Sequence, residues 1–166
     1  TLNNNGVLEN KVGTLNNNDT LDNYGTLTNN DTLTNNDTLV NNYTLTNNDT
    51  LNNDGTLDNY STLNNNGVLE NKVGTLNNND TLDNYGTLTN NDTLTNNDTL
   101  VNNYTLTNND TLNNDGTLDN YSTLNNNGVL ENKVGELNNS DTLNNIGMLN
   151  NNDYGTLNND DTLTND

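Results

Sequence analysis

Leucine recurs at a six-residue interval along almost the whole chain. The repeating unit is Thr-Leu-x-Asn-x-[Asp/Gly], as in residues 26–31 and 32–37. Because six is an even number, all these leucines would point to one face of a β-strand. In an α-helix each leucine would turn by about 240° from the last, and no apolar stripe would form. The pattern predicts short strands with leucine inward, beginning with Leu2, Leu8, Leu15, Leu21, Leu27, Leu33, Leu39 and Leu45.

Asparagine holds the fourth place of each unit as strictly as leucine holds the second. Places one to four, which open with threonine, suit a strand, and places five and six, rich in Asn, Asp and Gly, suit a corner. One such strand cannot bury its leucine alone, but stacked coils can. Identical amides stacked at strand spacing form a hydrogen-bonded ladder. We therefore expect an all-β, single-chain β-solenoid (β-helix) with an inward ladder of Asn4, Asn10, Asn17, Asn23, Asn29, Asn35, Asn41 and Asn47.

The composition by itself suggests disorder, because the net charge is −20 and hydrophobic residues make up 27% of the 166 residues. The regular leucine spacing argues against disorder, since a disordered polar tract has no need to keep leucine in phase. We expect one continuous solenoid over residues 1–166.

A longer repeat lies above the hexad. Residues 1–61 recur unchanged as residues 62–122, and residues 123–166 form a third copy that is partial and divergent. Each complete block holds ten units, one of which has seven residues and carries Lys11 or Lys72. The extra residue predicts a bulge at a corner, beside a weak exposed pair between Glu9 and Lys11.

The number of units per coil has two solutions. Three hexads give a triangular coil of 18 residues, and two give a flattened coil of 12. Ten units divide by two and not by three, and acidic third-place residues such as Glu9 and Asp22 fall only in even-numbered units. However, two-residue corners can hardly carry the chain between sheets packed about 10 Å apart. We favour the triangle, with the flattened coil as the alternative.

Catalysis is not expected from this sequence. It has no His and no Cys, and its few serines have no base to activate them. With 23 acidic and three basic residues, the chain is unsuited to binding nucleic acid. It also has no apolar run that could insert into a membrane. We expect a protein that is not an enzyme and needs no cofactor.

Calcium is an alternative ligand, because aspartates at the corners could stack at coil spacing and calcium would relieve their repulsion. The glycine-rich calcium repeat is missing, so solvated acids remain the simpler interpretation. The candidate metal ligands are Asp19, Asp31, Asp37 and Asp49.

Ice is a second alternative ligand. Outward Thr-x-Thr pairs occur at Thr26/Thr28, Thr32/Thr34 and Thr44/Thr46. Flat threonine arrays on β-solenoids resemble those of insect antifreeze proteins. Glycans are potential partners too, since Asn18, Asn30 and Asn42 begin Asn-x-Thr sequons and Tyr24, Tyr43, Tyr60 and Tyr154 lie at corners.

The motifs Asn-Tyr-Gly-Thr-Leu (residues 23–27) and Asn-Asn-Asn-Gly-Val-Leu (residues 3–8) resemble repeats of large bacterial surface β-solenoids. These are exoproteins of the filamentous-haemagglutinin type and similar adhesin stalks. The resemblance covers essentially the whole chain and implies a secreted rod that acts as a stalk or fibre. We expect an extracellular or cell-surface structural element that associates end to end through its open strand edges.

Overall fold

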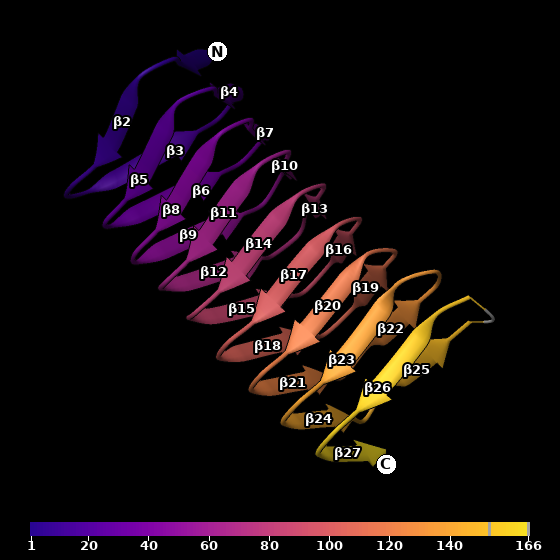
Figure 1. Ribbon diagram of the computed structural model, residues 1–166. Coiled ribbons are helices and arrows are strands. Elements are labelled where there is room, and N and C mark those ends of the chain that lie inside the picture. The colour runs from indigo at the N-terminus through magenta and orange to yellow at the C-terminus, as the bar shows by residue number, and fades with distance from the viewer. Residues whose placement is uncertain (153, 166) are drawn as a thin grey trace.

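The computed structural model describes residues 1–152 and 154–165. These residues form 27 short strands and no helix, arranged as a three-sided β-solenoid with the two termini at opposite ends of the rod (Figure 1). Each coil contributes one strand to each of three parallel sheets, which we name the β1, β2 and β3 sheets after their first strands.

The nine strands of the β1 sheet are, in order, β1 (Leu2–Asn4), β4 (Thr20–Asn23), β7 (Thr38–Asn41), β10 (Thr56–Asn59), β13 (Thr75–Asn78), β16 (Thr93–Asn96), β19 (Thr111–Asn114), β22 (Val129–Asn132) and β25 (Met148–Asn151). Those of the β2 sheet are β2 (Val7–Asn10), β5 (Thr26–Asn29), β8 (Thr44–Asn47), β11 (Thr62–Asn65), β14 (Thr81–Asn84), β17 (Thr99–Asn102), β20 (Thr117–Asn120), β23 (Glu136–Asn139) and β26 (Thr156–Asn159). Those of the β3 sheet are β3 (Thr14–Asn17), β6 (Thr32–Asn35), β9 (Thr50–Asn53), β12 (Val68–Asn71), β15 (Thr87–Asn90), β18 (Thr105–Asn108), β21 (Thr123–Asn126), β24 (Thr142–Asn145) and β27 (Thr162–Asn165).

The expected triangular β-solenoid is therefore confirmed, and the flattened coil of two hexads is not adopted. Each strand from β1 to β24 pairs with the strand three units later, so leucine lies beside leucine and asparagine beside asparagine, as in Leu21↔Leu39 and Asn23↔Asn41. A triangle lets each two-residue corner turn the chain onto an adjoining face, whereas a flattened coil would require it to cross to an opposite sheet.

The second-place leucines form the apolar core. From Leu21 to Leu143 they are buried, with at most 1% of their surface exposed. Of the eight leucines expected inward, Leu21, Leu27, Leu33, Leu39 and Leu45 are buried. Leu8 and Leu15 are partly buried and Leu2 is 42% exposed, because these three lie in the first coil and have a neighbouring coil on one side only.

The predicted asparagine ladder is confirmed. At each step Nδ2 of one fourth-place asparagine donates to Oδ1 of the asparagine one coil later. Asn65, for example, accepts from Asn47 at 2.8 Å and donates to Asn84 Oδ1 at 2.8 Å and to the Thr87 carbonyl at 3.0 Å. Of the eight asparagines predicted for the ladder, seven are buried and Asn10, in the second strand, is half-buried.

The seven-residue units keep the strand register, because the additional residue is absorbed in the corner. Between β2 and β3 the corner ends at Gly13, whose φ of 97° lies in the left-handed region that glycine adopts without strain. Asn10 closes this corner by donating to the Gly13 carbonyl at 3.0 Å, and Asn71 does the same to Gly74 at 2.7 Å. The expected Glu–Lys pair accompanies this corner, with 3.4 Å between Lys11 Nζ and Glu9 Oε2.

We predict that Asn65→Ala lowers the free energy of unfolding by about 2–4 kcal/mol, because buried amide and carbonyl groups of the adjacent coils lose their partners. Equilibrium denaturation in urea, followed by circular dichroism, measures this loss. The control is Asn66→Ala, the next residue, whose side chain lies at the surface and bonds only to Asn48 (2.9 Å). That variant should lose less than about 1 kcal/mol. Equal losses would show that the inner ladder is not a special source of stability.

Candidate functional site

The outer surface is set by the mismatch between two periods. A block has ten units and a coil has three strands, so each block shifts every surface feature by one face. The glutamate of the seven-residue unit shows this shift. Glu9 lies on the β2 sheet, Glu70 on the β3 sheet and Glu131 on the β1 sheet. Identical sequence blocks therefore present the same side chains in different directions.

The four candidate calcium ligands fall into two stacked pairs. Asp19 and Asp37 occupy the same corner in successive coils, where the Thr38 N–H donates to the Asp19 carbonyl. Asp31 and Asp49 are related in the same way at another corner. Glycine follows each pair in the next coil, at Gly55 and Gly67. Among the described residues, no three acidic side chains come together in a group that could hold a metal ion.

These corner carboxylates already have protein hydrogen-bond donors. In Asp37 and Asp49, Oδ1 accepts from the hydroxyl of the following threonine at 3.1 and 3.0 Å. The Gly13 N–H donates to Asp31 Oδ2 at 2.7 Å and lowers the pKa of this carboxyl group. The N-terminal ammonium, at 3.1 Å from Asp19 Oδ2, lowers the pKa of Asp19.

Thr-x-Thr strands are distributed over all three faces. They are β16 on the β1 sheet, β5 and β8 on the β2 sheet, and β6, β15, β18 and β27 on the β3 sheet. At most two of these strands are neighbours, as β5 and β8 are. The sequence pairs at Thr26/Thr28 and Thr44/Thr46 thus form one small patch, and Thr32/Thr34 lies on another face.

A second asparagine ladder runs along the outside, which the sequence analysis did not anticipate. Asn66, at the start of the second block, donates to Asn48, Asn48 donates to Asn30, and Asn30 donates to Glu9 Oε1. The same chain of bonds recurs one block later, from Asn127 to Glu70. The sequon residue Asn30 is part of this outer ladder, and the sequon residue Asn18 accepts a similar bond from Asn36 at 2.6 Å.

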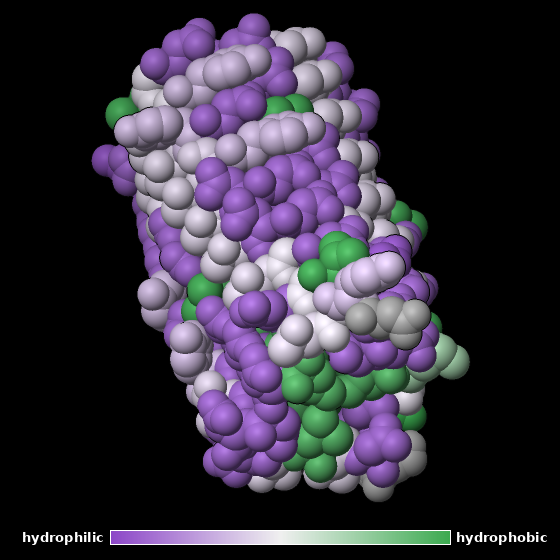
Figure 2. Space-filling model, turned by 45° about the vertical axis from the view of Figure 1, so that its right-hand side comes forward, coloured by the Kyte–Doolittle hydropathy of each residue, from purple (hydrophilic) through white to green (hydrophobic). Residues whose placement is uncertain are grey.

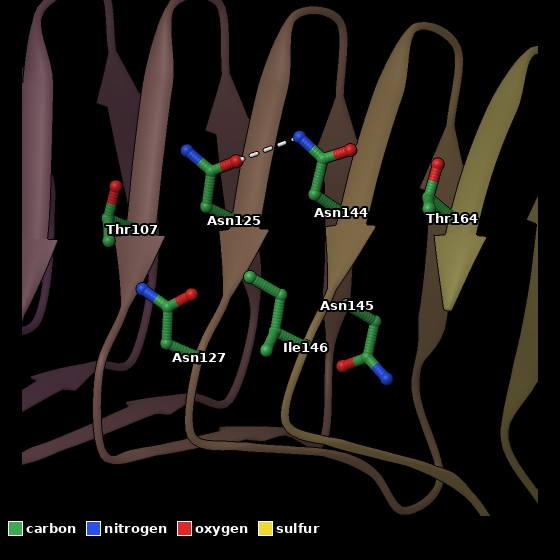
Figure 3. Close-up of a pocket in the computed structure, with 7 residues that line it drawn as sticks. All are labelled: Thr107, Asn125, Asn127, Asn144, Asn145, Ile146 and Thr164. Atoms are coloured by element: carbon green, nitrogen blue, oxygen red, sulfur yellow. Dashed lines mark hydrogen bonds between the residues drawn. The ribbon is translucent and has the colours of Figure 1, made fainter. Parts of the chain in front are cut away.

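A shallow depression of about 360 Å³ lies on the β3 sheet near the C-terminal end. Figure 3 shows Thr107, Asn125, Asn144 and Thr164 in a row across four neighbouring strands, with a hydrogen bond from Asn144 to Asn125. Ile146 and Asn127 lie beside this row at the corner. The lining has amides, hydroxyls and one aliphatic side chain, but no charged group and no nucleophile paired with a base.

Acidic and amide side chains dominate the exterior, and Figure 2 shows a largely hydrophilic face with one larger hydrophobic area toward its lower end. The exposed apolar side chains of the C-terminal part include Val134, Ile146 and Met148. Within the described part of the chain, no helix is long and apolar enough to cross a membrane.

Comparison with known proteins gives no relative. No protein-family model matches the chain, and neither a curated protein nor a solved structure shows significant similarity to it.

Asp83, a third-place residue of β14, provides a test of the surface electrostatics. Burial raises its pKa, so folding favours its neutral form. The stabilisation linked to protonated Asp83 is fully present below the pKa of the unfolded state, and it is lost as the pH rises through the pKa of the folded state. We predict that Asp83→Asn raises the urea midpoint at pH 7, and that the difference from wild type shrinks as the pH falls toward 3.

The control for this prediction is Asp98→Asn. It removes the same charge from an exposed corner, where Asp98 accepts from the Thr99 hydroxyl. If Asp98→Asn raises the urea midpoint at pH 7 as much as Asp83→Asn does, the effect comes from net charge and not from the burial of Asp83.

Proposed function

We propose that the chain is an extracellular structural rod or fibre, such as a stalk, filament or matrix component, without catalytic activity. The observation that carries this proposal is the uniformity of the core. The leucine column and the inner asparagine ladder continue through all three sheets without a change of packing between Leu21 and Leu143. Such a core specifies length and stiffness, and it can be extended by adding coils.

The resemblance of the repeats to filamentous-haemagglutinin-type exoproteins and adhesin stalks supports an extracellular location. The strongly acidic surface is consistent with this role, because like-charged rods repel and remain dispersed. Ice binding is less favoured by the geometry, since an ice-binding face needs a long row of threonine pairs and no more than two such strands are adjacent. Calcium binding is also less favoured, since the four candidate aspartates stack only in pairs, Asp19 with Asp37 and Asp31 with Asp49.

The direction of the inner ladder supports end-to-end association. Each Nδ2 group donates toward the C-terminal end, so Asn4, Asn10 and Asn17 present Oδ1 at one end and Asn151 and Asn159 present Nδ2 at the other. The two ends therefore have complementary donors, acceptors and strand edges. A second copy docked head to tail would continue the ladder, as would further coils of a longer chain.

The rod proposal predicts how length depends on sequence. Inserting a further copy of residues 62–122 after residue 122 should lengthen the particle by about 16 Å, which is ten strands at three per coil and about 4.8 Å per coil. The cross-section should not change. Small-angle X-ray scattering measures both quantities. The control insertion has its leucines replaced by asparagine and should add a flexible segment, while a compact particle with a wider cross-section would contradict the proposal.

Head-to-tail docking makes a separate prediction. Sedimentation velocity of the 166-residue chain should show linear oligomers that increase with protein concentration, and electron microscopy should show them as filaments. Leu157→Lys should abolish them, because Leu157 packs against the core in the last coil and a charge there would be buried on docking. The adjacent variant Thr156→Lys, at an exposed position, should retain them. A chain that stays monomeric at all concentrations would reject end-to-end docking but not the rod.

A further inference from the structure

Six of the seven tyrosines form two columns on the corners of the solenoid. The first tyrosine column is Tyr24, Tyr43 and Tyr60, which lie at the corner that follows the neighbouring strands β4, β7 and β10. Tyr24 and Tyr60 are the first residue after their strands, and Tyr43 is the second, after Asn42. The second column is Tyr85, Tyr104 and Tyr121, which follow β14, β17 and β20 in the same way. All six side chains are between 54% and 58% exposed, so both columns present their rings to solvent in the same manner.

The columns arise from the ten-unit block. Its tyrosines belong to the fourth, seventh and tenth units, which are three units apart and so share one corner in successive coils. The first column lies between the β1 and β2 sheets, and the second lies between the β2 and β3 sheets. One chain therefore carries the same arrangement twice, facing two directions.

An identical strip of outward side chains accompanies each column. In the first block Asp22, Val40 and Asp58 are directly opposite one another in neighbouring strands. In the second block the strip is Asp83, Val101 and Asp119. The two carboxylates of a strip are two coils apart, or about 10 Å, with valine between them.

The carboxylate at the far end of each strip is held in place by the next coil. Asn77 Nδ2 donates to Asp58 Oδ1 at 2.7 Å, and Asn138 Nδ2 donates to Asp119 Oδ1 at 2.8 Å. In each carboxylate this bond uses Oδ1, and Oδ2 takes no part in it. The recurrence of the contact in both blocks indicates that the geometry is a property of the unit and not of one coil.

We propose that each tyrosine column and its Asp-Val-Asp strip form a docking surface for an extended cationic peptide segment. Tyrosine rings attract guanidinium and ammonium groups through their π faces, and carboxylates pair with the same groups. The valine between them suits the aliphatic stem of a lysine or arginine. In an extended chain, residues three apart are about 10 Å apart, which matches the separation of the two carboxylates.

The negative charge of the rod favours a cationic peptide over the other ligands that tyrosine rings bind, such as a second rod or a sugar. A second copy of this rod also carries a net charge of −20, so lateral docking would bring carboxylates together. A neutral sugar could stack on the rings but gains no attraction from the two carboxylates. Because the two surfaces face different directions, one rod can hold two cationic segments and so crosslink them.

The experiment titrates the 166-residue chain with an unstructured Arg-Ser-Ser repeat peptide in about 0.15 M salt, where general attraction is screened. Isothermal titration calorimetry should show two equivalent sites. Because the chain has no tryptophan, its intrinsic fluorescence comes from tyrosine and should change on binding. The triple variant Tyr24→Asn, Tyr43→Asn, Tyr60→Asn should retain one site, and the variant with both columns replaced should bind about tenfold more weakly or worse.

Two controls separate this surface from general charge attraction. Phenylalanine at the same six positions keeps the π faces and should bind within about threefold of wild type. Asp22→Asn with Asp58→Asn removes two charges from a strip and should weaken one site, while Asp37→Asn with Asp49→Asn removes two charges elsewhere and should leave both. Circular dichroism checks that every variant keeps its β signal.

Equal loss of affinity in the two aspartate variants would overturn the proposal, because binding would then depend on net charge alone. Peptide binding that is unaffected by the tyrosine replacements would also overturn it. A third contrary result is tyrosine-dependent binding of a neutral dextran oligosaccharide without binding of the peptide, which would assign the columns to carbohydrate. Concentration-dependent lateral association lost in the tyrosine variants would assign them to a second copy of the rod.

Discussion

The hydrogen bond from each inner asparagine to the asparagine of the next coil is the constraint on which the rest of the structure depends. Leucine packing is not directional and by itself would tolerate an axial or lateral shift between coils. A buried amide such as that of Asn65 has donors and acceptors that must be met, and the coils above and below meet them. A slip of one residue would turn both leucine and asparagine outward, so the ladder fixes the register of the whole rod.

A fixed core leaves the outward places free to vary, and the surface differs from coil to coil while the interior does not. The first-place and third-place side chains range from threonine to glutamate, valine and aspartate on the same sheet, as at Val40 between Asp22 and Asp58. The outer asparagine ladder from Asn66 to Glu9 adds bonds between coils, but at exposed positions where water competes for the same groups.

A block has ten units and a coil has three strands, so each successive block begins one face further round the rod. This mismatch determines how the outward side chains are distributed around the axis. A block length divisible by three would have placed each unit of the block on the same face in every copy. The ten-unit block instead turns every feature to the next face, so the net charge of −20 is spread around the axis. This arrangement suits a rod approached from several sides better than one that lies against a single flat surface. It also makes the two tyrosine columns point in different directions, which connects the proposed binding surface to the proposed structural role.

The sequence by itself determined the class of fold and the interior. An even interval between leucines allows one inward face only in a strand, and the matching interval of asparagine identifies the ladder, so the sequence alone places Leu27 and Asn29 in the interior. The sequence predicted the three-strand coil less directly, because the ten-unit block favoured two strands per coil and the short corners favoured three. Only the tertiary structure decided which distant units are neighbours. Because each coil closes after three units, Tyr24, Tyr43 and Tyr60 come to one corner and the threonine pairs are divided among three faces. The physical reason is that inward positions obey the local period of six, whereas outward neighbours depend on how many units close one coil.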